Sequence, residues 1–168
     1  MFSVGIIGPE STGKSTLAKE LAEQFHGIYV PEYAREYIES KVESQKSKAE
    51  REKAKEVTRE ELCEIARHQI EEIEAVRIQN SEFSFFDTEL IVTKVWFEYA
   101  FGRVPEWLEE AILRYPMNMY LLTAPDIPWI PDPTRYNGSD AMRQELFERY
   151  ESEIQALDIP YFIITHKN

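Results

Sequence analysis

The chain has 168 residues and a formal net charge of −12; 43% of its residues are hydrophobic and 30% are charged. This length and balance suit one folded domain, and the acidic charge disfavours binding to nucleic acid phosphates or to anionic lipid. No stretch approaches the roughly 20 apolar residues that span a bilayer, and the N-terminus lacks the pattern of a signal peptide. We therefore expect a single cytoplasmic domain over residues 1–168, with no nucleic acid and no membrane as partner. The composition leaves its oligomeric state open.

Short apolar runs alternate with helical patterns along the chain. In the first helical pattern, residues 15–26, Leu17, Leu21 and Phe25 recur at four-residue spacing, which predicts a helix that buries this face. Two further helical patterns cover residues 62–76 and 92–99. The alternation predicts an α/β fold of the P-loop type, a five-stranded parallel sheet with helices on both faces. The expected strands cover residues 2–7, 28–30, 83–86, 119–122 and 159–164.

Residues 39–57 have a different composition. They are almost all Glu, Lys, Ser, Gln, Arg and Ala, and Val42 is the only large apolar residue before Val57. We expect no contribution to the core from such a segment. It is either a solvated helix or mobile excursion, as charged runs usually are, or a flap over the substrate site.

Residues 8–15, with the sequence GPESTGKS, match the phosphate-binding pattern G-x-x-x-x-G-K-[ST] in full. Gly8 and Gly13 allow backbone angles at which successive N–H groups wrap a phosphate, and the helix N-terminus that follows adds partial positive charge. Lys14 is expected to reach the β- and γ-phosphates of ATP, and the Ser15 hydroxyl to bind Mg²⁺. The expected nucleotide-binding residues of this loop are Gly8, Glu10, Ser11, Thr12, Gly13, Lys14, Ser15 and Thr16.

Two carboxylates follow strands that are expected beside this loop. Asp87 ends the run at 83–86 as the acid of a Walker B element does, so it is our candidate for binding Mg²⁺ and substrate. The alternative is that Asp87 only caps the next helix. Glu32 follows the second strand and is a candidate for accepting the proton of the attacking hydroxyl, unless it merely pairs with Arg35. The sequence does not decide whether Glu32 or Asp87 is the base.

Residues 124–143 contain four prolines, so most of this segment is irregular. Because it follows a strand, the region 124–150 is expected to form a small lid on the ligand side of the sheet, with a helix from near Ser139. Arg135 and Arg143 are candidates for closing on the phosphate during transfer. The alternative is that both are ordinary surface arginines.

Trp96 and Trp129 lie near these proposed site segments, and each side chain is suited to stack on a planar ring of the substrate. Tryptophan is more often a core residue, and we assign Trp107 to the core. The stacking role of the other two is the less common alternative.

Several segments appear in the order of one known family: GPESTGKST at 8–16, EYARE at 32–36, FDTE at 86–89, PDIPW at 125–129 and the arginines at 135–143. Together they resemble the ribosylnicotinamide kinase domain of bacterial NadR proteins and its stand-alone relatives. That family phosphorylates the ribose 5′-hydroxyl of nicotinamide riboside with ATP and Mg²⁺. The resemblance implies the roles given above for Lys14, Ser15, Glu32, Asp87 and Arg135, with Lys14, Glu32, Asp87 and Arg135 as the catalytic residues, and a substrate or phosphate contact for Arg35. The expected substrate-binding residues are Glu32, Tyr33, Arg35, Asp87, Trp96 and Trp129.

Two differences from the family affect this interpretation. Pro31 stands where family members have an aromatic residue before the acid, which keeps a kinase for another nucleoside or a vitamin precursor as an alternative. The chain also stops soon after the fifth strand, which keeps an ATP-binding, metabolite-sensing module with little turnover as another. We expect neither the adenylyltransferase activity nor the DNA binding of the multifunctional members.

Overall fold

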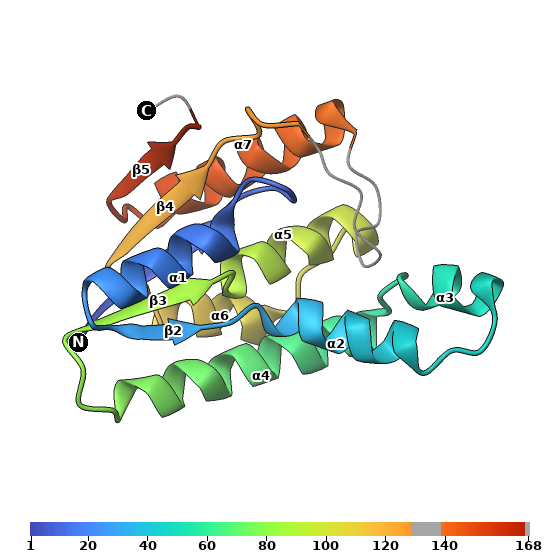
Figure 1. Ribbon diagram of the computed structural model, residues 1–168, viewed down its shortest axis with the longest axis horizontal. Helices are drawn as coiled ribbons and strands as arrows, with labels where there is room; N and C mark the ends of the chain where they lie inside the picture. Colours follow the sequence, from blue (N-terminus) through green and yellow to red (C-terminus); the bar gives the residue numbers. More distant parts are fainter. Residues whose placement is uncertain (129–138, 167–168) are drawn as a thin grey trace.

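The computed structural model describes residues 1–128 and 139–166, and within these ranges five parallel strands form one sheet (Figure 1). The order of the strands across the sheet is β2-β3-β1-β4-β5. This arrangement confirms the predicted α/β class and the parallel sheet. The strands are β1 (Phe2–Ile7), β2 (Ile28–Val30), β3 (Phe83–Asp87), β4 (Met119–Thr123) and β5 (Tyr161–Ile164).

The register of the central pair, β1 and β3, places two site segments together. Gly5 lies opposite Phe86, and Ile6 lies opposite Asp87. Both strands run in the same direction, so the loop after β1 and the carboxylate that ends β3 leave the sheet at one edge. Ligands of open parallel sheets bind at this edge.

Helices cover both faces of this sheet, as predicted. One face packs against α1, and the other packs against α4, α5, α6 and α7. The α6 helix was not predicted; it buries Leu108, Ala111 and Ile112. The helices are α1 (Lys14–Gln24), α2 (Tyr33–Glu43), α3 (Lys48–Ala54), α4 (Arg59–Arg77), α5 (Leu90–Phe101), α6 (Glu106–Arg114) and α7 (Asp140–Ala156).

The face of α1 that meets the sheet differs from the prediction. Ala18 and Ala22 are its buried residues, whereas Leu17 and Leu21 are only partly buried. Phe25 lies past the end of the helix and is exposed, with its ring against the rings of Phe83 and Phe85. The helix follows the phosphate-binding loop directly and packs closely on β3, and small side chains permit this approach.

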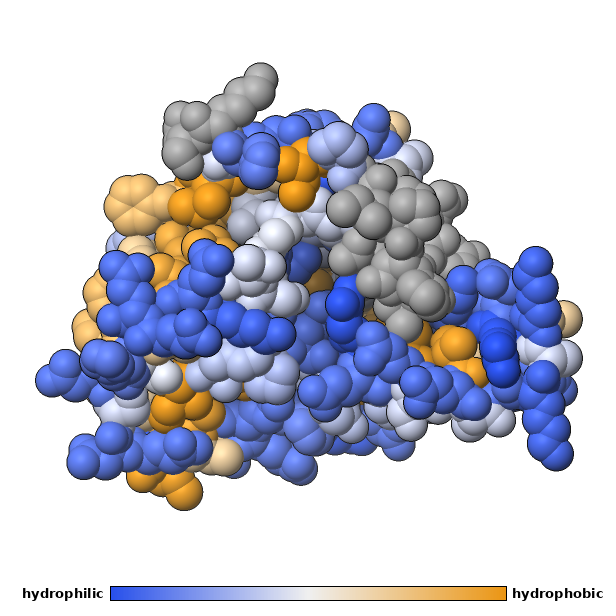
Figure 2. Space-filling view, viewed as in Figure 1, coloured by the Kyte–Doolittle hydropathy of each residue, from blue (hydrophilic) through white to orange (hydrophobic). Residues whose placement is uncertain are grey.

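The charged segment 39–57 contributes to an arm formed by α2 and α3, which extends beyond the sheet in Figure 1. Most of its side chains are exposed, and its surface is largely hydrophilic in Figure 2. The expectation that the segment contributes nothing to the core is wrong at its end, because Ala54 is buried and Val57 packs on the core. The Lys41 amine of α2 donates a hydrogen bond to the Glu56 carbonyl oxygen at 2.8 Å, which holds this end of the segment against α2.

Apolar side chains reach the surface on the side of the molecule where β5 and the N-terminus lie (Figure 2). They include Phe2, Phe25, Phe162 and Ile163, of which Phe162 is the most exposed. Within the described residues, none of the helices has both the length and the apolar character needed to cross a membrane.

Candidate active site

The loop between β1 and α1 depends on two glycines for different reasons. A Cβ atom at Gly8 would lie 2.2 Å from Thr123 Oγ1 and 2.6 Å from the Thr123 carbonyl oxygen, so only glycine allows this approach to β4. Gly13 adopts φ 82°, in the left-handed region, as it caps α1. Ser11 also has a positive φ, of 56°, without being glycine. The loop is therefore held in an uncommon conformation by its surroundings.

Side chains of the loop bond to its own backbone. The Lys14 amine donates to Pro9 O at 2.8 Å, and the Thr12 hydroxyl donates to the same carbonyl oxygen at 2.8 Å. Thr12 also shares a hydrogen bond with Thr123, whose hydroxyl lies 3.2 Å from Ile7 O. The Lys14 amine is thus folded over the loop, at the position from which it would meet a bound phosphate.

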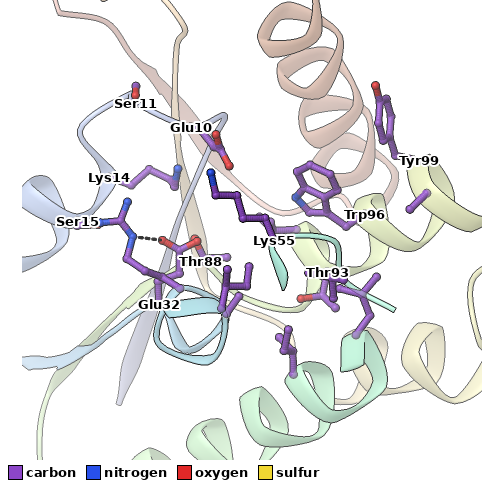
Figure 3. A pocket seen from close by; sticks show the side chains of 18 of the residues that line it. Glu10, Ser11, Lys14, Ser15, Glu32, Lys55, Thr88, Thr93, Trp96 and Tyr99 are labelled. Carbon is purple, nitrogen blue, oxygen red and sulfur yellow. Dashed lines mark ion pairs between the residues drawn. The ribbon is translucent and has the colours of Figure 1, made fainter. Parts of the chain in front are cut away.

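A cavity of about 710 Å³ opens beside this loop. This volume is in the range of small-molecule sites, roughly 300–1,000 Å³. Residues 10–16 line one side of the cavity, and side chains of α5 line the opposite side (Figure 3). Further lining residues come from α2, from the end of the arm and from α4, including Glu32, Arg35, Lys55, Val57 and Leu62.

Glu32 lies at the N-terminal end of α2 and lines the cavity. Its side chain makes no capping hydrogen bond to this helix, and its contact with Arg35 is long, with 3.9 Å between Oε2 and Nε. Burial raises the pKa of the Glu32 carboxyl; Lys14 opposes this shift, and the negative charge of Asp87 adds to it. Glu32, Lys14 and Asp87 thus lie close enough for the charges of Lys14 and Asp87 to affect the pKa of Glu32.

Asp87 is 1% exposed at the end of β3, where Tyr29 donates a hydrogen bond of 3.4 Å to its Oδ2. Burial, together with Asp87, raises the pKa of Tyr29 to about 12. The helix-capping alternative for Asp87 is wrong, because Glu89 caps α5 by accepting a hydrogen bond from the Ile91 amide at 3.0 Å.

The residues at this position fit a magnesium ion. Within the described residues, Asp87 Oδ1 is buried and has no hydrogen-bond partner, and no group of three or more His, Cys, Asp or Glu forms a self-sufficient metal site. Mg²⁺ in phosphoryl-transfer sites typically takes one or two protein oxygens together with phosphates and water. Asp87 and the Ser15 hydroxyl are suited to supply those protein oxygens.

Several residues that line the cavity were not predicted from the sequence. Lys55 comes from the end of the arm, and Figure 3 shows its amine and that of Lys14 pointing into the same cavity between Glu10 and Glu32. Only 15% of the Lys55 side chain is exposed, and its amine pairs with Glu52 at 2.9 Å. Its position in a run of similar charged residues gave no signal that would separate it from its neighbours.

On the α5 side, Tyr99 joins the predicted Trp96 as an aromatic lining residue. Their rings pack edge to face, with centroids 5.8 Å apart. The Thr93 hydroxyl donates to the buried Gln69 amide oxygen at 2.8 Å, which fixes α5 against α4 beneath this wall. Residues at spacings of three and four along α5 therefore present one continuous surface to the cavity.

Other predicted site residues lie elsewhere. Tyr33 stacks on the His68 ring of α4, with centroids 3.5 Å apart, and among the described residues it is not part of the cavity lining. Arg143 of α7 is buried and bonds to carbonyl oxygens of the phosphate-binding loop. Trp129 and Arg135, which were also predicted for the site, lie outside the described residues.

These features define the class of the protein as a P-loop fold. Its phosphate-binding loop follows the central strand β1, and an acid, Asp87, ends the adjacent strand β3. The chain belongs to the AAA domain family, whose model matches residues 3–168.

Curated relatives agree with the resemblance found in the sequence. The chain is 29% identical over 144 residues to the trifunctional NAD biosynthesis/regulator protein NadR of Escherichia coli (strain K12), a match that covers 85% of this chain and 33% of NadR. It is 28% identical over 143 residues to NadR of Salmonella typhimurium (strain LT2), covering 84% and 33% respectively. The chain thus spans about a third of the length of these relatives.

Solved structures share the fold. A NadR protein in complex with NR matches with a TM-score of 0.75 at 22% identity, over 99% of this chain and 46% of that one. Thymidylate kinase from Ehrlichia chaffeensis matches with a TM-score of 0.62 at 14% identity, over 99% and 88%. Deoxyadenosine kinase from M. mycoides with bound dATP matches with a TM-score of 0.57 at 15% identity, over 98% and 90%. The predicted P-loop fold is confirmed.

Proposed function

We propose that this protein transfers the γ-phosphate of ATP to a hydroxyl group of a small nucleoside, with nicotinamide riboside as the acceptor. The observation that carries the proposal is the position of Glu32. Its carboxylate faces the cavity beside the phosphate-binding Lys14, makes no capping bond, and has a pKa raised by burial. A carboxylate with a raised pKa in such a place is suited to accept a proton from a substrate hydroxyl.

The proposed reaction proceeds from nucleotide binding to attack by the acceptor hydroxyl and transfer of its proton. The loop amides and Lys14 hold the phosphates of ATP. The acceptor hydroxyl attacks the γ-phosphorus, a new oxygen–phosphorus bond forms, and the bond to the bridging oxygen breaks to release ADP. The hydroxyl proton passes to the Glu32 carboxylate. Mg²⁺ bound with the nucleotide would be held by Ser15 and Asp87, and its chemical contribution is to neutralise phosphate charge.

Two observations support nicotinamide riboside as the acceptor. Relatives with 28–29% identity are NadR proteins, and a NadR structure with the same fold holds NR. The aromatic wall of Trp96 and Tyr99 suits a planar ring, and the pyridinium of nicotinamide riboside carries a positive charge that aromatic faces attract. The same wall also suits other nucleosides, so the acceptor is tested against a panel.

The test is ADP release measured with Mg-ATP and a panel of nucleosides and vitamin precursors, with product identified by mass. We expect turnover with nicotinamide riboside that gives the mononucleotide, and its loss in Lys14→Ala. Lys19→Ala, an exposed lysine on the same helix, is the matched control. Turnover of another nucleoside alone would keep the kinase and change its acceptor. Binding of nicotinamide riboside without product would favour a metabolite-sensing module.

A further inference from the structure

The guanidinium of Arg143 is buried against the phosphate-binding loop. The residue is 2% exposed and is one of the largest fully buried side chains of the described residues. Its Nε donates to Glu10 O at 3.2 Å, and its Nη2 donates to Ser11 O at 3.3 Å and to Ile127 O at 2.9 Å. One side chain of α7 thus bonds to two consecutive carbonyls of the loop and to the segment after β4.

These two carbonyls determine where two loop amides point. In a trans peptide the C=O and the following N–H lie in one plane and point in opposite directions. When Arg143 draws the carbonyl oxygens of Glu10 and Ser11 toward α7, the N–H groups of Ser11 and Thr12 are turned the other way. Amides at these positions of the loop are the groups that cradle the phosphates of a bound nucleotide.

The conformation of Ser11 gives a reason for this bracing. Ser11 has φ 56°, a region that costs free energy for a residue other than glycine. Such a residue keeps the conformation only when surrounding bonds enforce it. Arg143 bonds to the carbonyl oxygens of Glu10 and Ser11, which belong to the two peptide units that flank the Ser11 Cα.

The α7 helix is well placed to hold Arg143 still. Leu146, Tyr150 and Ile154 are buried on its inner face, and Glu153 pairs with Lys94 of α5 at 2.7 Å. The ion pair of Arg143 with Asp140 adds little, because the distance is 3.4 Å and the Asp140 side chain is 94% exposed. The principal polar partners of the guanidinium are therefore backbone carbonyls.

We propose that Arg143 is a positioning residue: it aims the Ser11 and Thr12 amides at the β-phosphate by holding the preceding carbonyls. It acts through the loop and does not itself contact the transferring phosphate. This inference rests on the nucleotide-binding part of the proposed function and is independent of the identity of the acceptor. This positioning role replaces the direct phosphate contact that was predicted for Arg143 from the sequence.

The test compares ATP and ADP affinities by calorimetry in Arg143→Met and Arg143→Lys. We expect both affinities to fall by the same factor, tenfold or more in the Met variant and less in the Lys variant. Arg149→Met, a more exposed arginine on α7, is the control and should leave both unchanged. Loss of ATP affinity alone would mean a direct γ-phosphate contact and overturn the inference. Unchanged affinities with a lower melting temperature would also overturn it.

A second variant separates loop positioning from folding. Ser11→Gly removes the free-energy cost of the positive φ. In the Arg143→Lys background this substitution should therefore raise ADP affinity at least threefold, whereas in the wild-type background it should raise ADP affinity much less. Additive effects would contradict the inference, and this measurement stands if Arg143→Met fails to fold. A wild-type protein that bound neither nucleotide would overturn the proposed function and this inference with it.

Discussion

The hydroxyl groups of Thr12 and Thr123 lie 2.6 Å apart and join the phosphate-binding loop to the end of β4. The Thr123 hydroxyl also lies 3.2 Å from Ile7 O, so one buried side chain contacts both ends of the chain segment that forms the loop. The lack of a side chain at Gly8 makes room for this contact.

Thr123→Val should loosen this connection without changing the volume of the core. The substitution removes the hydroxyl that meets Thr12 and Ile7, at a cost of about 1–2 kcal/mol in the free energy of unfolding. Urea denaturation measures this loss, and nucleotide affinity should fall with it. Thr123→Ser keeps the hydroxyl and should retain most of the affinity; equal losses in both variants would show that the methyl group matters instead.

Lys55→Ala should lower turnover without unfolding the protein. The Lys55 amine points into the cavity beside Lys14, where a cation stabilises negative charge on phosphate oxygens (Figure 3). We expect a loss in kcat/KM on the order of tenfold to a hundredfold. Lys53→Ala, an exposed residue of α3 two positions before Lys55, is the matched control. Equal rates in the two variants would assign Lys55 to the surface of the arm.

Glu32→Gln and Asp87→Asn should fail in different ways. Loss of a general base lowers kcat by roughly 10²–10⁴-fold with little change in ATP affinity, and we expect this of Glu32→Gln. Asp87→Asn should instead raise the Mg²⁺ concentration needed for half-maximal rate. Glu36→Gln, one turn further along α2, is the control. A normal rate in Glu32→Gln would make Asp87 the better candidate for the base.

Glu89 should make the protein less stable as pH rises toward neutrality. Burial raises the pKa of this carboxyl from the ordinary 4.5 to about 7. Between these values the folded state keeps a proton that the unfolded state has lost, so the free energy of unfolding falls with rising pH, by about 3 kcal/mol in total. Above pH 7 both states are ionised and the loss is complete.

Glu89→Gln isolates this contribution, because the Gln oxygen can still accept the Ile91 amide and cap α5. Denaturation at pH 5 and pH 8 should show a smaller difference in the variant than in the wild type. Glu23→Gln, an exposed residue of α1, should match the wild type at both values. Parallel pH profiles for all three proteins would contradict the assignment.

The sequence predicted the strands and the loop well because their signals are local. A complete phosphate-binding pattern between an apolar run and a helix has few structural solutions, and Gly8 and Gly13 both have geometric reasons in the structure. Four-residue spacing did not identify the inner face of α1, since the alanines on the neighbouring stripe carry little signal although they are what close packing needs.

The sequence did not decide where long or neighbouring polar side chains point. Asp87 and Glu89 lie two positions apart, and only the backbone path after β3 decides which of them caps α5. Lys55 and Arg143 have flexible stems, so their partners depend on packing between elements far apart in the sequence. Such tertiary choices have no periodic pattern to reveal them.

Different elements form the two sides of the cavity, so the protein's preference for an acceptor can change separately from its phosphate-binding loop. In the proposed function, the loop binds the phosphates and Glu32 accepts the hydroxyl proton, whereas one face of α5, including Val92, Trp96 and Tyr99, forms the opposite wall of the cavity. Substitutions on that single helical face can alter which ring is accepted while the chemistry stays intact. Natural drift or directed evolution of acceptor preference should therefore concentrate its substitutions on α5.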